Sequence, residues 1–229
     1  CWGANGSGQL GLGNVTPRGA DAALMGNNLP LVDLGTDYEA INIACGGEHS
    51  CATRADGLLK CWGDNSAGQL GLGASGNRGD GSNEMGDDLP FVKVQDDDLV
   101  VVAVALGFSH TCVIALSGDL FCWGGSENGR LGNAQTDPVG TTVDSMKYLQ
   151  PVDLGSGRSA IGISLGSAHT CVLLNVGDIV CFGSNGFAQL GVGSNSNIGD
   201  DAGEMGDNLH TVDLGTGRSA AQVAAGDLH

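Results

Sequence analysis

Short apolar runs fill this chain, and glycine or polar turn residues separate them. The longest run, residues 99–106, has eight apolar residues, and runs such as CVIAL at 112–116 and CVLL at 171–174 are shorter. These runs lack a clean alternation of polar and apolar positions, which is typical of strands covered on both faces. Eight residues also fall far short of the roughly 20 that a membrane-spanning helix needs. The pattern therefore predicts an all-β protein built from short, buried strands.

The apolar runs recur with a period of about 60 residues. The tags CWGANGSGQLGLG, CWGDNSAGQLGLG, CWGGSENGRLG and CFGSNGFAQLGVG begin at positions 1, 61, 122 and 181. Each unit reads as four short strands: a run such as LPLVDLG, a second run such as AINIACG, and a hairpin. Four-stranded sheets that repeat in this way are the blades of a β-propeller. We expect one partial propeller domain over residues 1–229, with both ends cut within a blade and repeats at approximately 1–60, 61–121, 122–180 and 181–229.

Each hairpin carries two cysteines ten positions apart, and their spacing fixes the expected turn. The first pair centres on residue 56, which predicts a three-residue loop with Gly57 in the left-handed position that glycine favours. Gly118 and Gly177 follow the midpoints of the other two pairs. In this register the cysteines face each other at a non-hydrogen-bonded pair, where side chains approach most closely. The expected disulfides are Cys51–Cys61, Cys112–Cys122 and Cys171–Cys181.

Two other uses of these cysteines explain the pattern less well. Small buried thiols are common in protein cores, but they leave the matched register of three pairs unexplained. A zinc site would call for two cysteines separated by two residues, and the sequence has no such pair. Cys1 occupies the second-cysteine position of its unit, so its partner is expected to lie outside the chain. Cys45 has no counterpart in the other units and reads as a small core residue or a free thiol.

Disulfides also bear on the compartment in which the protein works. They form and persist in oxidising environments, so we expect a secreted, cell-surface or otherwise extracellular protein. Two N-glycosylation sequons, at Asn5 and Asn14, are compatible with that location. With 9 basic and 26 acidic residues, the formal net charge is -17. Such a surface repels nucleic acid and anionic membranes, so other proteins or copies of the chain itself are the expected partners, in an extracellular assembly without membrane insertion.

The tags HTC…G…CWG and N-x-x-GQLG resemble the regulator of chromosome condensation repeat, which occurs in seven-bladed propellers. The resemblance recurs in every unit and implies a β-propeller with further blades elsewhere. The founding member of that family is an exchange factor for a small nuclear GTPase and docks on chromatin, whereas this chain is acidic and has no basic tail. Other members are photoreceptors, inhibitors and interaction modules, so the resemblance does not decide the function.

Two recurrent motifs invite a functional interpretation that their repetition disfavours. His49, His110 and His169 occupy one position in successive units, which indicates a packing role and no catalysis. The glycine-rich loops lack the Lys-Ser/Thr pair of a phosphate-binding loop, so Asn5, Asn65 and Asn185 are expected to build tight crossover turns.

Two acidic, glycine-punctuated loops suggest calcium as the one candidate metal, with no other cofactor expected. Calcium prefers several carboxylate and carbonyl oxygens held by such a loop. The corresponding loops of the first and third units have lost most of these carboxylates, which instead favours simple solvated loops. The candidate ligands are Asp80, Glu84, Asp87 and Asp88 in one loop and Asp200, Asp201, Glu204 and Asp207 in the other.

Together these observations favour a non-enzymatic, extracellular structural or binding module that mediates protein–protein, matrix or filament assembly. One alternative is a propeller that regulates another protein, as a GTPase exchange factor or an enzyme inhibitor. Another is a glycan-acting enzyme, which would need a polar cluster unique to one unit. Only His210 and Cys45 stand out in this way, and they belong to separate units.

Overall fold

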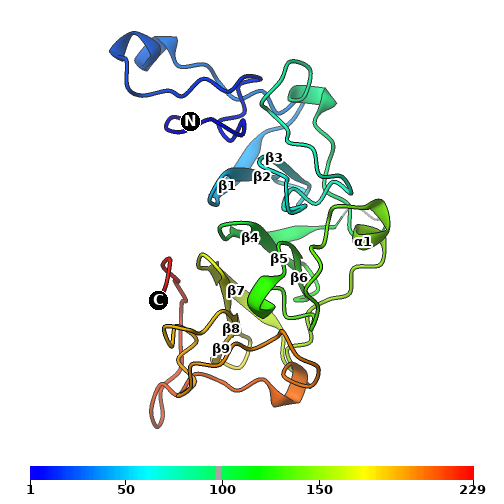
Figure 1. Cartoon of the computed structure of the whole chain (residues 1–229), viewed down its shortest axis with the longest axis vertical. Coiled ribbons are helices and arrows are strands. Elements are labelled where there is room, and N and C mark those ends of the chain that lie inside the picture. The colour runs from blue at the N-terminus through cyan, green and yellow to red at the C-terminus, as the bar shows by residue number, and fades with distance from the viewer. Residues whose placement is uncertain (96–98) are drawn as a thin grey trace.

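The computed structural model describes residues 1–95 and 99–229 as three antiparallel sheets that lie side by side (Figure 1). Each sheet has three strands in chain order. The sheets are β1 (Ala40–Cys45), β2 (His49–Arg54) and β3 (Leu59–Gly63); β4 (Val101–Leu106), β5 (His110–Ala115) and β6 (Leu120–Gly124); and β7 (Ala160–Leu165), β8 (His169–Leu174) and β9 (Ile179–Gly183). The strands that begin each sheet, β1, β4 and β7, lie along one side of the molecule (Figure 1). This is the arrangement of consecutive propeller blades, and it confirms the all-β prediction.

Among residues 1–95 and 99–229, helical structure is confined to short segments outside the sheets. The one α-helix of this part of the chain, α1 (Val143–Lys147), lies on the side opposite β1, β4 and β7 (Figure 1). Single turns of 3₁₀-helix occupy η1 (Ala22–Leu24), η2 (Gly26–Asn28), η3 (Gly86–Asp88), η4 (Glu127–Gly129) and η5 (Gly206–Asn208). In the described part of the chain, no helix is long and apolar enough to cross a membrane.

The prediction of four regular strands per blade is wrong, because the outer segment forms only a sparse pairing. This segment lies beside the third strand of the preceding hairpin, where the N–H groups of Val92, Val152 and Val212 donate to strand carbonyls at 2.9, 2.7 and 2.8 Å. Pro90 and Pro151 sit inside two of these segments and have no N–H, so a continuous ladder cannot form through them; the third segment has no proline and still forms only an isolated bridge between Val180 and Thr211. The number of blades stays a prediction.

The hairpins have the predicted register and turns. Cys51 pairs directly with Cys61, and the corresponding cysteines pair in the other two hairpins. Gly57, Gly118 and Gly177 adopt φ values of 87°, 87° and 84°, the left-handed region that the three-residue loop requires.

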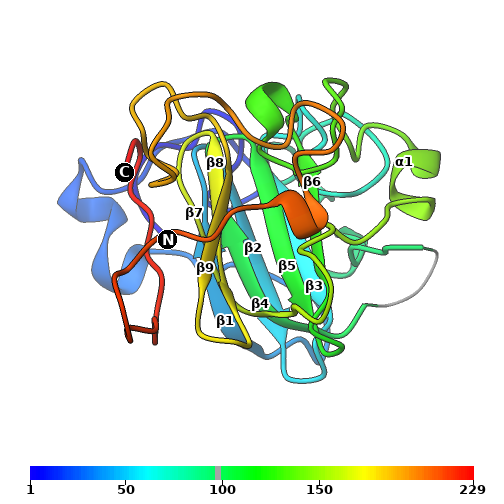
Figure 2. The same ribbon diagram turned by 90° about the horizontal axis from the view of Figure 1, so that it is seen from below.

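The main apolar core runs through all three sheets, and two smaller clusters lie around Trp62 and around Leu190. The middle strands β5 and β8 are buried along their whole length, and β2 is buried except for Arg54 at its end. Trp62, Trp123 and Phe182 occupy equivalent positions on the third strands and are fully buried. Figure 2 shows the strands of neighbouring sheets stacked face to face, as expected where both faces of a sheet are covered.

Candidate functional site

The structure contains the three expected disulfides, Cys51–Cys61, Cys112–Cys122 and Cys171–Cys181, with Cα–Cα distances of 4.1, 4.2 and 4.2 Å. The bonded cysteines are at most 6% exposed. Each bridge closes a hairpin in the interior of a blade, so its role is structural. Cys1 is half-buried and Cys45 is exposed, and both are free thiols here. A partner for Cys1 outside the chain stays a prediction.

Two of the recurrent histidines, His49 and His110, join their blade to the next, whereas the ring nitrogens of His169 have no hydrogen-bond partner among the described residues. His49 Nε2 lies 2.9 Å from Thr111 Oγ1, and that hydroxyl donates to the carbonyl of Gln69 at 2.9 Å. Trp123 Nε1 donates to the same carbonyl at 3.0 Å. Because the Thr111 proton is given to Gln69, the hydroxyl must accept its second bond, so His49 is the neutral tautomer that carries its proton on Nε2.

The same connection recurs around the structure with small variations. His110 Nε2 lies 3.2 Å from Thr170 Oγ1, which donates to the carbonyl of Arg130 at 2.9 Å. Sequence reasoning expected the histidines to serve packing, but it did not find their threonine partners. The sequence does contain a signal, because a serine or threonine directly follows each recurrent histidine. The ring of His49 or His110 meets the threonine that follows the histidine of the next unit, about 60 residues later.

Burial keeps these histidines neutral. It lowers the pKa of His49 from 6.5 to about 4 and lowers the pKa of His110 well below its usual value. For His169 the pKa is also lowered, again chiefly by burial. A solvent-exposed catalytic base would need the opposite environment, so the geometry agrees with a structural role.

The crossover loops are organised by a buried asparagine. Asn65 Nδ2 donates to the carbonyls of Ala74 and Gly76 at 2.6 and 3.0 Å, while its Oδ1 accepts from the Leu70 N–H at 3.0 Å. Asn185 makes the equivalent set of bonds. These asparagines build the tight turns that the sequence predicts.

The asparagines of the two sequons differ in their burial. Asn5 belongs to the same class of buried asparagines: it is 1% exposed, and its Nδ2 donates to the carbonyls of Asn14 and Thr16. Asn5 therefore serves the turn, and a glycan on its Nδ2 would replace one of the two donated hydrogens; its glycosylation stays a prediction. Asn14 is half-buried, and its glycosylation stays a prediction.

The acidic loops use several of their carboxylates inside the protein. Glu84 accepts from the N–H groups of Gly79 and Gly81 at 3.0 and 2.8 Å, and Glu204 accepts in the same way from Gly199 and Asp201 at 2.7 and 3.1 Å. These contacts tie each glutamate to the backbone of its own loop.

Two aspartates reach across to the neighbouring unit. Asp87 accepts from the N–H and the hydroxyl of Thr36 at 2.7 and 2.8 Å, and Asp207 accepts similarly from Ser156 at 2.6 and 2.9 Å. These hydrogen bonds lower the pKa of both carboxyl groups. Among residues 1–95 and 99–229, no three Asp, Glu, His or Cys side chains gather in a group that could hold a metal. The eight carboxylates proposed for calcium, including Asp80, Asp88, Asp200 and Asp201, are therefore not brought together.

Three equivalent grooves lie at the periphery, each between one unit's glycine loop, the segment that follows it and the next unit's methionine turn. We call them the first, second and third outer grooves, with volumes of about 410, 200 and 490 Å³. Each contains one methionine, which is Met85, Met146 or Met205 respectively. The linings differ in charge: the first contains Asp33, Asp87 and Asp88, the second Lys93 and Lys147, and the third Asp144, Asp153 and Asp201.

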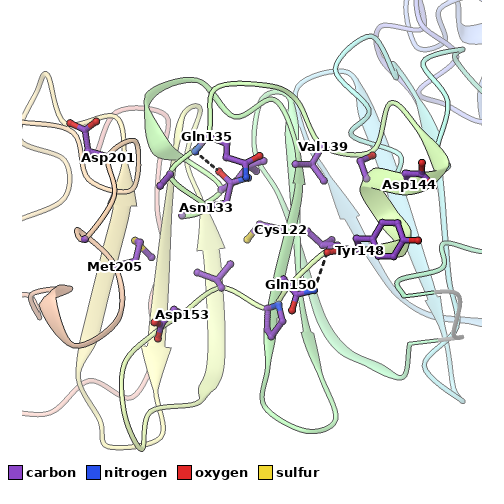
Figure 3. Close-up of a pocket in the computed structure, with 18 residues that line it drawn as sticks. Cys122, Asn133, Gln135, Val139, Asp144, Tyr148, Gln150, Asp153, Asp201 and Met205 are labelled. Carbon is purple, nitrogen blue, oxygen red and sulfur yellow. Dashed lines mark hydrogen bonds between the residues drawn. The ribbon is translucent and has the colours of Figure 1, made fainter.

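The third outer groove is the largest of the three (Figure 3). Asp201, Met205 and Asp153 lie at one end, and Tyr148 and Asp144 of the α1 region lie at the other (Figure 3). No sequence motif marks this groove, because its walls come from separate segments of two units. It is the best candidate surface for recognition, since it is open, chemically mixed and different from its equivalents.

Comparison with known proteins identifies the family of the repeats. A family model described as Regulator of chromosome condensation (RCC1) repeat matches residues 1–53, 56–114 and 117–173, and a second model with the same description matches 40–69, 101–130 and 160–189. The chain is 31% identical over 199 residues to the probable E3 ubiquitin-protein ligase HERC6 of Homo sapiens, covering 83% of this chain and 17% of that protein. It is 32% identical over 199 residues to the ultraviolet-B receptor UVR8 of Arabidopsis thaliana, covering 85% of this chain and 39% of the receptor.

Solved structures agree on the fold. Yeast RCC1 (Prp20), in its complex with Kap60, superposes with a TM-score of 0.68 at 19% identity, over 99% of this chain and 48% of that one. A second structure of Prp20p from Saccharomyces cerevisiae gives a TM-score of 0.58 at 21% identity, over 92% of this chain and 45% of that one. This chain thus spans less than half of these relatives. The chain folds as part of an RCC1-like propeller, and it belongs to the regulator of chromosome condensation (RCC1) repeat family.

Proposed function

We propose that this chain is a non-catalytic, protein-binding propeller module. The observation that carries this proposal is that recurrent and variable side chains lie in different parts of the structure. The side chains that recur at equivalent positions, such as His49, Thr111 and Asn65, are buried and make hydrogen bonds within and between blades, although Ser126 replaces the asparagine in one unit. The side chains that change from unit to unit line the open outer grooves. Recognition by variable surface residues on a rigid scaffold is the usual arrangement of a binding protein.

Relatives support protein binding as the general role. One solved complex has Kap60 bound to yeast RCC1, and another structure is described with binding to Gsp1p and histones. The ligase relatives give less guidance, because this chain corresponds to 14–17% of their length and ligase activity cannot be assigned to that part alone.

We further propose that the module works outside the reducing cell interior, in an extracellular or cell-surface assembly. Three buried disulfides in matched register support this location, since structural disulfides are rare in the cytosol. Protein isolated from its native source in the presence of an alkylating reagent should show these six cysteines unmodified until it is reduced. If Cys51, Cys61, Cys112 and Cys122 are all alkylated without reduction, the extracellular proposal is wrong.

Binding is tested by crosslinking the full-length protein to its partners in its native extracellular fraction, followed by mass spectrometry of the crosslinked peptides. We expect crosslinks from partner proteins to fall on the loops that line the outer grooves. Crosslinks only between copies of the chain would define a self-assembling module, while capture of a nucleotide-binding protein would indicate a regulatory propeller instead. Absence of any protein crosslink, combined with turnover of a glycan substrate by the purified protein, would overturn the proposal in favour of an enzyme.

A further inference from the structure

The third outer groove has an apolar floor beneath a rim of carboxylates (Figure 3). Its floor includes three buried side chains and two half-buried ones, and its rim carries three exposed aspartates. The floor residues are Leu131, Val139, Leu149, Val152 and Met205, and the rim residues are Asp144, Asp153 and Asp201. Lysine and arginine side chains match this layout, because an apolar stem carries the charged head at its tip.

The rim carboxylates have unused capacity to accept hydrogen bonds. Within the described residues, Asp144 and Asp201 accept none through their carboxylates, and Asp153 accepts one, from the Gly155 N–H at 3.0 Å. Arg158 is a nearby cation, but it donates to the carbonyls of Leu154 and Leu209 at 3.2 and 3.1 Å and does not line the groove.

The two ends of the groove differ in local charge. Lys147 lies 5.9 Å from the ring of Tyr148 at the Asp144 end. Asp153 and Asp201 lie at the other end, on opposite sides of Met205 (Figure 3). The same loop also contains Asp200, Glu204 and Asp207, which make this end more negative. A bound cation is therefore expected at the Asp153–Asp201 end.

We propose that the third outer groove binds a partly apolar segment of a partner protein that bears arginine or lysine side chains, with cationic heads at Asp153 and at Asp201. The proposal rests on the protein-binding role above and names the surface and the chemistry of the partner. The net charge of -17 attracts a basic partner from a distance, and the groove supplies the local match. Arginine is the stronger candidate head, because its guanidinium presents a fork of donors to carboxylates.

The second outer groove acts as an internal control. In the second outer groove, Lys93 and Lys147 replace the acidic rim, and the volume falls to about 200 Å³. That groove should reject a basic segment. The first outer groove is acidic, but the ammonium group of Lys60 sits behind it, bound to the carbonyls of Leu34 and Gly86 at 2.8 and 2.9 Å. Val180 occupies the equivalent position behind the third groove, but Arg158 there donates to the carbonyls of Leu154 and Leu209, so the first groove is acidic and has a cation behind it in the same way as the third.

The four methionines of the chain allow each groove to be observed separately. The experiment follows ¹³C-methyl methionine signals of the full-length protein by NMR during titration with an octapeptide of alternating arginine and leucine. The Met205 signal should shift during the titration, and the Met146 signal, in the groove with no carboxylate in its lining, should not shift. A matching octapeptide of alternating glutamate and leucine should leave Met205 unchanged. If Met146 and Met205 shift together, or if Met205 does not respond at all, the proposal is wrong.

Charge-neutralising variants test the proposed position of the head. Asp201→Asn and Asp153→Asn should each weaken binding of the arginine–leucine peptide by about tenfold, since a charge-assisted hydrogen bond is lost. Asp178→Asn removes the same charge from an exposed hairpin turn outside the groove and should change binding less than twofold. Equal effects of Asp178→Asn and Asp201→Asn would mean general charge attraction and would overturn the site. If a natural partner binds Asp201→Asn as tightly as the wild type, this groove is excluded while the protein-binding role stands.

Discussion

Mild acid should destabilise the fold through the buried histidines that lie between blades. In the folded protein the pKa of His49 is about 4, compared with 6.5 for a solvent-exposed histidine, because burial disfavours the imidazolium. The unfolded chain therefore takes up a proton first as the pH falls. The stability that neutral His49 contributes is complete above pH 6.5 and is lost progressively between pH 6.5 and 4.

The size of the effect follows from these two values. Between pH 7.5 and pH 5, His49 takes up more protons in the unfolded chain than in the folded protein. Integrated over this range, the difference corresponds to about 1.4 pK units, or about 2 kcal/mol of unfolding free energy for this one histidine. Protonation also leaves the imidazolium beside Thr111, whose hydroxyl can still accept from Nε2. The cost therefore comes mainly from burying the charge and not from breaking that hydrogen bond.

The assay compares urea unfolding of the wild type and of His49→Gln at pH 7.5 and at pH 5. Glutamine keeps a donor for Thr111 but does not titrate, and the many carboxylates affect both proteins alike. The stability advantage of the wild type should shrink by about 2 kcal/mol on acidification. His210→Gln, at an exposed position outside the network, is the control and should show no such change. An advantage that stays constant within about 0.5 kcal/mol would refute the reasoning.

Three further predictions concern the scaffold. Thr111→Val removes the hydroxyl that links His49 to the carbonyl of Gln69 and should cost about 1–3 kcal/mol, measured by chemical denaturation; a neutral result would show that the bond is not needed. Replacing both cysteines of the Cys51–Cys61 bridge with alanine should lower stability by about 3 kcal/mol in the same assay, whereas adding reductant to that variant should have no further effect at this hairpin. Gly57→Ala places a Cβ 2.9 Å from a backbone nitrogen at φ 87°, so it should lower the melting temperature, and an unchanged value would contradict the turn assignment.

Local features of the fold could be predicted from the sequence because each is encoded within one unit. The spacing of Cys51 and Cys61 around Gly57 determines the hairpin, its turn and its disulfide without any knowledge of neighbours. The fourth strand was over-predicted for a related reason. Its apolar run is present in every unit, but Pro90 and Pro151 remove donors that a regular ladder needs.

Features that depend on contact between units could not be predicted in the same way. A period of 60 residues shows that His49 and His110 are equivalent, but it does not show which residue of the next blade meets each ring. Glu84 and Asp87 looked like calcium ligands because their carboxylates were counted without the N–H groups that they accept from. The third outer groove was missed for the same reason, since its floor and rim belong to different units.

The contact between His49 and Thr111 has a direction, since the imidazole always belongs to the earlier blade and the hydroxyl to the later one. A unit of this kind therefore presents an imidazole to the blade that follows it and a hydroxyl to the blade that precedes it, so neighbouring blades join head to tail. A duplicated unit inherits both halves and fits between its parents without new chemistry. Gene duplication can thus lengthen such an array one blade at a time, and damage to one blade is felt chiefly by the two beside it.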